Sequence, residues 1–263
     1  MAEKSSVLIT GASTGIGAVY ADRFARRGHN LILVARDAVR LHVLAEKLQA
    51  QYGILAEVLP ADLTFPGALE IVARRLREDP SIGVLVNNAG MSLSGTFITQ
   101  SEADISRMTA VNLSAVLTLA HAAATGFAGR GRGNIINLSS VVGLAPEFGM
   151  SVYGATKAFV LYLSQGLNLE LGAQGVYVQA VLPAATRTEI WERSGVDVNT
   201  LTGVMDAGEM VDAALVGYDR RESVTIPPLQ REEQWSLHEQ TRLAMLSEFS
   251  QEHPAPRYRK SDD

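Results

Sequence analysis

The chain of 263 residues contains no cysteine, which removes a whole group of chemistries. Disulfide bonds, thiolate nucleophiles and cysteine-ligated zinc sites are all excluded. A protein without disulfides is typical of a reducing compartment, so we expect a cytoplasmic protein. The N-terminal residues run directly into an apolar segment without the layout of a signal peptide, which agrees with this expectation.

Charged and aromatic residues are also scarce, at 19% and 6% of the chain, and the formal net charge is −5. Basic residues are scattered, which disfavours a nucleic-acid partner. The most apolar long stretch, residues 115–129, is too short and too polar to span a bilayer, so we expect no membrane partner. The five histidines lie far apart without the spacing of metal ligands, so we expect no metal.

Hydrophobic residues make up 47% of the chain, enough for a sizeable core. Short apolar segments alternate with segments whose apolar residues recur at helical spacing. This alternation predicts an α/β fold: a doubly wound parallel sheet of about seven strands with helices on both faces. The expected strands are 7–9, 31–35, 56–59, 84–86, 134–138, 176–182 and 224–226, and the expected helices are 16–27, 38–52, 66–78, 102–124, 152–171 and 207–218.

We assign residues 1–228 to one catalytic domain and residues 229–263 to a C-terminal helical extension of the same domain. In the extension, an apolar stripe at helical spacing includes Trp235, Leu237 and Leu243. Three roles are open for it: closing the pocket, crossing to a partner subunit, or packing on its own domain. Within the expected helix 102–124, we expect an interruption near Asn112.

The first expected strand leads into a glycine-rich loop with the spacing Gly11-x3-Gly15-x-Gly17, and a helical pattern follows. A strand, a glycine loop and a helix N-terminus form the arrangement that binds a dinucleotide pyrophosphate. Glycines let the backbone come close to the anion, and the unpaired N–H groups of the first helical turn face it. A tight turn without a ligand is the alternative.

Tyr153 and Lys157 are four residues apart in an expected helix, so their side chains share one face. A free tyrosine has a pKa of about 10, and a neighbouring ammonium favours the phenolate. Lowering that pKa by about 3 units requires roughly 4 kcal/mol, part of which an oxidised nicotinamide can supply. Ser140 ends the preceding strand, where its hydroxyl can bind a substrate oxygen. An ordinary surface contact between Tyr153 and Lys157 is the alternative.

Taken together, these features resemble the short-chain dehydrogenase/reductase family over roughly residues 5–228. The resemblance implies a single-domain Rossmann-like fold. Residues 10–17 match the family's T-G-x3-G-x-G loop, residues 87–90 match its N-N-A-G motif, and Asn112, Ser140, Tyr153 and Lys157 match its catalytic tetrad.

The resemblance also implies a role for each tetrad residue. Tyr153 would be the acid/base, and Ser140 would orient the substrate oxygen. Lys157 would hold the nicotinamide ribose and lower the tyrosine pKa, and Asn112 would support a water relay.

The expected coenzyme contacts come mainly from the same match, with Asp62 at the adenine ring. One departure is Pro183-Ala184, where the family often has Pro-Gly. The family's threonine in this segment matches Thr186 or Thr188, and we prefer Thr188. The irregular residues 184–205 form a mobile lid in the family, and a plain loop is the alternative. The full set is Gly11, Ser13, Thr14, Gly15, Ile16, Gly17, Arg36, Asp62, Leu63, Asn88, Ala89, Gly90, Tyr153, Lys157, Pro183 and Thr188.

Arg36 bears on the choice of coenzyme, because it ends the second expected strand. An acidic side chain there would bind the ribose 2′-hydroxyl of NAD. Arg36 instead offers a planar cation that suits a 2′-phosphate, so we expect NADP. Asp37 is the argument for NAD, since it would repel that phosphate if it pointed inward.

We therefore expect an NADP(H)-dependent oxidoreductase that interconverts a carbonyl and a secondary alcohol by hydride transfer. The alternatives are a coenzyme-binding regulatory protein of the same fold without turnover, and a non-redox epimerase or dehydratase. The expected partner is a small-molecule carbonyl or alcohol substrate, and no residue identifies it further. Analogy of fold and two long helices suggest a homodimer or homotetramer.

Overall fold

The computed structural model describes residues 4–259, and its centre is a sheet of seven strands in the order β3-β2-β1-β4-β5-β6-β7. All neighbouring strands pair in parallel. The chain starts in the middle and winds first to one edge and then to the other, which confirms the doubly wound sheet. The strands are β1 (Ser6–Thr10), β2 (Leu31–Ala35), β3 (Ala56–Pro60), β4 (Ile82–Asn87), β5 (Gly133–Leu138), β6 (Val176–Val181) and β7 (Val224–Thr225).

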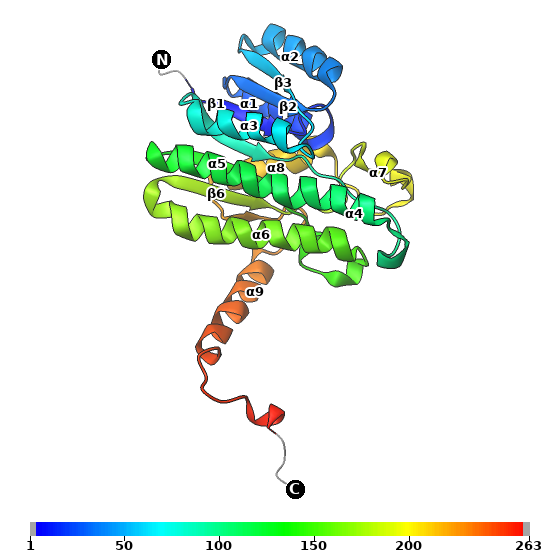
Figure 1. Cartoon of the computed structure of the whole chain (residues 1–263), viewed down its shortest axis with the longest axis vertical. Coiled ribbons are helices and arrows are strands. Elements are labelled where there is room, and N and C mark those ends of the chain that lie inside the picture. The colour runs from blue at the N-terminus through cyan, green and yellow to red at the C-terminus, as the bar shows by residue number, and fades with distance from the viewer. Residues whose placement is uncertain (1–3, 260–263) are drawn as a thin grey trace. The chain divides into compact units, whose positions relative to one another are not determined.

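Helices cover both faces of this sheet, and Figure 1 shows α3, α5 and α6 side by side across the near face. Successive residues of β1 point to opposite faces. Val7 and Ile9 pack with α1, α2 and α8, while Leu8 packs with α3 and α5. The helices are α1 (Gly15–Arg26), α2 (Ala38–Tyr52), α3 (Pro66–Glu78), α4 (Glu102–Thr109), α5 (Val116–Gly129), α6 (Ser151–Leu171), α7 (Ile190–Arg193), α8 (Ala207–Asp219) and α9 (Glu232–Ala244).

The expected long helix from residue 102 is interrupted where the sequence suggested. Between α4 and α5 lies a π-helix, Ala110–Ala115, and Asn112 is buried within it. A π-helical turn carries one extra residue, so it shifts the face on which the following side chains lie. Such turns are frequent at functional sites, which agrees with Asn112 as a candidate site residue.

Residues 184–205, which have no regular pattern in the sequence, are ordered by local contacts. Thr186 pairs with Met205 in an isolated parallel bridge. Between them lie the single-turn helix α7 and a 3₁₀ turn, Val198–Thr200. Elements of three or four residues are too short to leave a periodic signal, which explains why the sequence did not reveal them.

A second compact unit begins at Pro228 and contains α9. A 3₁₀ turn, Met245–Glu248, follows the helix. The expected helix is present, and none of its residues is buried. The apolar side chains of Leu237 and Leu243 in α9, and of Phe249 after the 3₁₀ turn, are exposed. The role of this extension stays a prediction.

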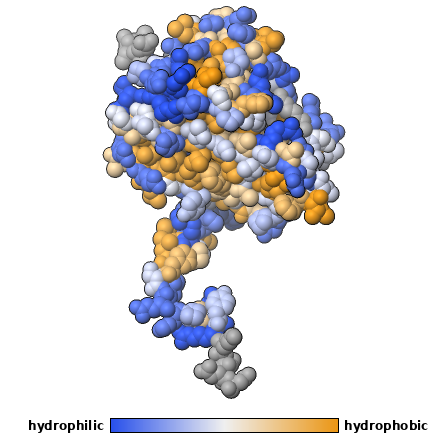
Figure 2. Space-filling model, viewed as in Figure 1, coloured by the Kyte–Doolittle hydropathy of each residue, from blue (hydrophilic) through white to orange (hydrophobic). Residues whose placement is uncertain are grey.

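One helical stretch, Glu102–Gly129, is long and apolar enough by length and composition to cross a membrane. Half of its most apolar window is buried, with Leu119 and Phe127 in the core against the sheet. A core helix meets the same criterion, so the expected lack of a membrane partner stays a prediction. Apolar side chains also gather on the face that carries α5 and α6 (Figure 2), where Leu117 and Leu169 are exposed.

Candidate active site

The loop between β1 and α1 folds so tightly that side chains cannot be added to its glycines. Gly11 and Gly15 have φ angles of +65° and +54°, which favour glycine. A Cβ atom at Gly17 would collide with the carbonyl oxygen of Gly11 and lie 2.6 Å from Nδ2 of Asn88. Thr14 begins α1 without a side-chain cap, so the first-turn N–H groups keep their hydrogen-bonding capacity. This cradle fits a dinucleotide pyrophosphate.

A buried threonine joins this loop to the end of β4. The Thr10 hydroxyl accepts hydrogen bonds from the backbone N–H groups of Asn88 and Ala89, both at 3.0 Å. The Asn88 amide in turn donates to the carbonyls of Thr10 at 2.9 Å and Gly11 at 3.2 Å. Thr10 is therefore a supporting residue that our candidate set omitted, although it opens the T-G-x3-G-x-G motif.

Two of the four tetrad residues meet beside Gly90. A Cβ atom at Gly90 would lie 3.4 Å from Oδ1 of Asn112 and 3.6 Å from Nζ of Lys157. The Asn112 amide donates to the Met91 carbonyl at 2.9 Å and to the Thr156 hydroxyl at 3.1 Å. Asn112 thus links the chain after β4 to α6, which carries Tyr153 and Lys157.

Ser140, Tyr153 and Lys157 converge at the carboxyl ends of β5 and β6. Nζ of Lys157 lies 5.5 Å from the centre of the Tyr153 ring and donates to the Leu138 carbonyl at 2.8 Å. The Ser140 hydroxyl donates to the Pro183 carbonyl at 3.2 Å and is a hydrogen-bond partner of the Tyr153 phenol. The structure therefore brings all four tetrad candidates to one place.

The pKa of Tyr153 differs from the sequence expectation. Burial of the phenol raises this pKa to about 12, although the hydrogen bond with Ser140 lowers it. We expected Lys157 to lower it, but burial also lowers the pKa of Lys157, to about 8. The four-residue spacing predicts that an ammonium lies near the phenol, but it does not predict that burial removes water from both groups. Lowering the phenol pKa toward neutrality therefore requires a further positive charge beside it.

Lys157 should give the coenzyme-free protein a pH-dependent stability. The folded protein releases the Lys157 proton near pH 8, whereas the unfolded chain keeps it to about 10.5. Because the unfolded state binds more protons in this window, the free energy of unfolding should rise by about 1.4 kcal/mol per pH unit between pH 8 and 10. Below pH 8 the contribution is constant. Urea unfolding of the wild type and of Lys157→Met over this range measures how the free energy of unfolding depends on pH. The same pH dependence in both proteins would refute the prediction.

At the end of β2, Asp37 is engaged with its own helix. Its carboxylate accepts the backbone N–H of Arg40 at 3.0 Å and lies 3.5 Å from the Arg40 guanidinium. Asp37 is thus the N-cap of α2, while Arg36 is exposed. This capping weakens the argument for NAD, because the Asp37 carboxylate already has partners in α2 and does not need a ribose hydroxyl.

The remaining coenzyme candidates lie along the same edge. Ser13 and Thr14 belong to the glycine loop, and Ile16 to the first turn of α1. Leu63 is buried after β3, and Asp62 accepts two hydrogen bonds from Thr64. Near Pro183, the two threonine candidates differ. A Cβ atom at Gly15 would lie 3.0 Å from Cγ2 of Thr188, so Thr188 is against the glycine loop. Thr186 is buried and donates to the Ala184 carbonyl at 3.0 Å. This geometry supports Thr188.

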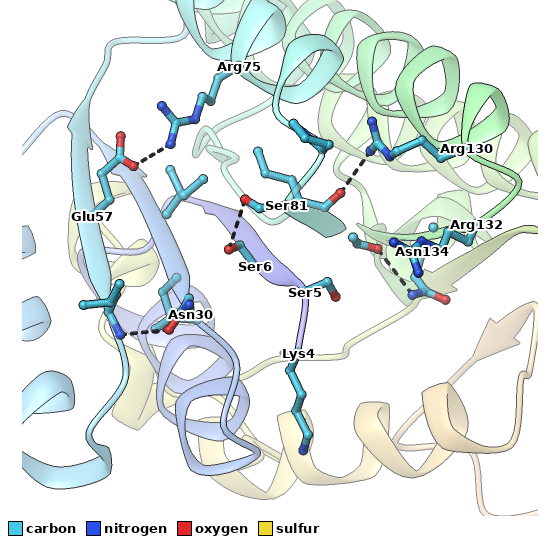
Figure 3. Close-up of a pocket in the computed structure, with 17 residues that line it drawn as sticks. Lys4, Ser5, Ser6, Asn30, Glu57, Arg75, Ser81, Arg130, Arg132 and Asn134 are labelled. Carbon is cyan, nitrogen blue, oxygen red and sulfur yellow. Dashed lines mark hydrogen bonds and ion pairs between the residues drawn. The ribbon is translucent and has the colours of Figure 1, made fainter. Parts of the chain in front are cut away.

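A separate hollow of about 530 Å³ lies at the amino-terminal ends of the strands, where β1 and β4 begin (Figure 3). Two of its arginines are engaged locally: Arg75 pairs with Glu57 at 2.7 Å, and Arg130 donates to the Ile82 carbonyl at 3.0 Å. None of the candidate residues lines it. Within residues 4–259, no group of three His, Asp or Glu side chains could hold a metal, and the expected lack of a metal stays a prediction.

Residues 5–199 match the model of the short chain dehydrogenase family, so the chain belongs to this family of oxidoreductases. A solved short-chain dehydrogenase from Sphingobium yanoikuyae in complex with NADPH is 60% identical, with a TM-score of 0.96, over 97% of this chain and 100% of that one. The bulky-bulky ketone specific alcohol dehydrogenase from Comamonas testosteroni is 55% identical, with a TM-score of 0.92, over 98% and 100%. The very-long-chain 3-oxoacyl-CoA reductase of Anas platyrhynchos is 36% identical over 190 residues, which cover 70% of this chain and 60% of that protein's length.

Proposed function

We propose that this protein is an NADP(H)-dependent oxidoreductase that interconverts a ketone and a secondary alcohol. The observation that carries the proposal is the convergence of Ser140, Tyr153 and Lys157 at the carboxyl edge of the sheet that also holds the glycine cradle. Membership of the family and the similar structure in complex with NADPH support the choice of coenzyme.

In this mechanism each side chain handles a proton or a charge. A bound nicotinamide coenzyme supplies or accepts the hydride. During reduction, Tyr153 donates its proton to the substrate oxygen, and Ser140 donates a hydrogen bond to the same oxygen. The Lys157 ammonium stabilises the phenolate that remains, and with a pKa near 8 it is charged at neutral pH. Asn112 orders the water through which the proton is replaced.

For the substrate, we propose ketones with a large apolar group on each side of the carbonyl. The relative from Comamonas testosteroni is described as specific for bulky-bulky ketones. Large apolar side chains are also exposed between β4 and α4 and between β5 and α6, at the edge that carries the tetrad: Phe97, Ile98, Leu144 and Phe148. Such side chains suit apolar substituents better than charged ones.

The complete tetrad argues against a regulator without turnover, since coenzyme binding alone does not require Ser140 and Tyr153 together. A non-redox epimerase or dehydratase would not consume coenzyme, so stoichiometric oxidation of NADPH separates it from our proposal. A cytoplasmic location and a homodimer or homotetramer stay predictions.

Coenzyme preference tests the proposal directly. Wild-type kcat/KM with a bulky aromatic ketone should be about 10- to 100-fold higher with NADPH than with NADH, because Arg36 adds a charge-assisted hydrogen bond to the 2′-phosphate. Arg36→Asp should remove or reverse this preference. Steady-state rates with both coenzymes measure it, across ketones of increasing size on each side. A clear preference of the wild type for NADH would overturn the coenzyme assignment.

A further inference from the structure

Arg40, in the first turn of α2, is held by a residue from a distant part of the chain. Nη1 of its guanidinium donates to both carboxylate oxygens of Glu189, at 2.9 Å and 2.7 Å. Glu189 immediately precedes α7 in the segment of residues 184–205, which we call the lid segment. Nε of Arg40 also lies 3.5 Å from Oδ2 of Asp37, the N-cap residue of α2. The ion pair between Arg40 and Glu189 therefore joins the lid segment to the first turn of α2, shortly after the end of β2.

This ion pair lies where the anionic part of a coenzyme has to bind. Arg40 lies four residues after Arg36, the residue that we propose for the 2′-phosphate. Thr188, the neighbour of Glu189, is against Gly15 of the pyrophosphate cradle. Because Glu189 is bonded to Arg40, its carboxylate would compete with a 2′-phosphate at this place, and like charges repel each other.

Glu189 does not move alone, because the lid segment is internally bonded. The backbone N–H of Arg187 donates to the Met205 carbonyl, and that of Met205 donates to the Ala185 carbonyl, both at 2.9 Å. The Trp191 indole N–H donates to the Thr186 carbonyl at 2.7 Å. A change at Glu189 is therefore passed to Trp191, which makes this tryptophan a natural reporter.

We propose that Glu189 holds Arg40 as an internal substitute for the 2′-phosphate of NADP(H), and that coenzyme binding exchanges the carboxylate for the phosphate. The proposal rests on the proposed function, because it requires a coenzyme with a 2′-phosphate. A carboxylate and a phosphate both accept charge-assisted hydrogen bonds from a guanidinium, so the exchange keeps Arg40 paired. Arg40 is then a second residue that selects NADP(H), and Glu189 lowers the apparent affinity by competing for it.

The exchange is tested by binding of coenzyme fragments, which excludes any effect on turnover. Dissociation constants for 2′,5′-ADP and for 5′-AMP, which lacks only the 2′-phosphate, are measured by calorimetry on the wild type and on Glu189→Gln. Because the ion pair is about half exposed, Glu189→Gln should tighten 2′,5′-ADP by about two- to fivefold and leave 5′-AMP unchanged. The matched control is Glu192→Gln, which removes the same charge from an exposed position of the same segment and should change both affinities equally or not at all.

Arg40→Met supplies the second arm. It should weaken 2′,5′-ADP by about tenfold, and in its presence Glu189→Gln should have no further effect. Trp191 fluorescence gives an independent readout in a Trp235→Phe background, since the chain has only these two tryptophans. In that background, 2′,5′-ADP should shift the emission of Trp191 when Glu189 is present. Glu189→Gln should produce part of the same shift without ligand.

The outcomes separate the exchange from the coenzyme assignment. If the wild type prefers 2′,5′-ADP but Glu189→Gln leaves its affinity unchanged, or alters the affinity for 5′-AMP equally, the exchange is wrong and the proposed function survives. If the wild type binds both fragments equally, the assignment of NADP(H) is wrong, and the exchange is wrong with it.

Discussion

Replacing Tyr153 by phenylalanine should lower kcat by about 100- to 10,000-fold while leaving NADPH binding nearly unchanged. The substitution removes one hydroxyl and keeps the ring beside Lys157, so the packing of α6 is preserved. Ser140 and Lys157 remain, but neither supplies the proton that the substrate oxygen needs. Ketone reduction followed by NADPH absorbance gives kcat, and titration of NADPH fluorescence gives the dissociation constant.

A second tyrosine of the same helix provides the control for this experiment. Tyr162 is 82% exposed and is not among the candidate site residues. Tyr162→Phe also removes one phenol hydroxyl from α6, so it should keep wild-type kcat. Full activity in Tyr153→Phe would mean that another group is the acid, and equal losses in both variants would point to a general effect on α6.

Much of the fold was predictable because each strand and helix carries its own local signal. The bounds of α2 and α3 equal those expected, since helical periodicity ends at Gly53 in the first case and begins at Pro66 in the second. The parallel sheet followed from mostly apolar strands that alternate with helices. The break in the helix at Asn112 was also visible from the sequence, although the π-helical form of that break was not.

What the sequence could not supply depends on burial and on pairs of residues far apart in the chain. The four-residue spacing of Tyr153 and Lys157 suggested a lowered phenol pKa, whereas desolvation raises it. No local pattern could join Arg40 to Glu189, because 149 residues separate them. The roles of the tetrad residues stay predictions until the variants are measured.

Gly17→Ala should abolish tight coenzyme binding and destabilise the protein, although helix propensity alone favours alanine by about 1 kcal/mol. Gly17 is in the first turn of α1, and a methyl group there would collide with the Gly11 carbonyl and lie 2.6 Å from the Asn88 amide nitrogen. Overpacking of this kind costs about 1–3 kcal/mol, so Tm should fall by roughly 5 °C. To make room, the glycine loop has to shift, which distorts the pyrophosphate cradle.

Gly67→Ala is the matched control, because Gly67 is also in the first turn of a helix and a Cβ atom there meets nothing within 4 Å. It should keep or slightly raise Tm and leave NADPH affinity unchanged. Thermal unfolding and NADPH titration of both variants make the comparison, and we expect at least a tenfold weaker affinity in Gly17→Ala alone. If Gly17→Ala binds NADPH as tightly as Gly67→Ala, the close approach of Gly17, Gly11 and Asn88 does not form the coenzyme cradle, and the pyrophosphate must bind elsewhere.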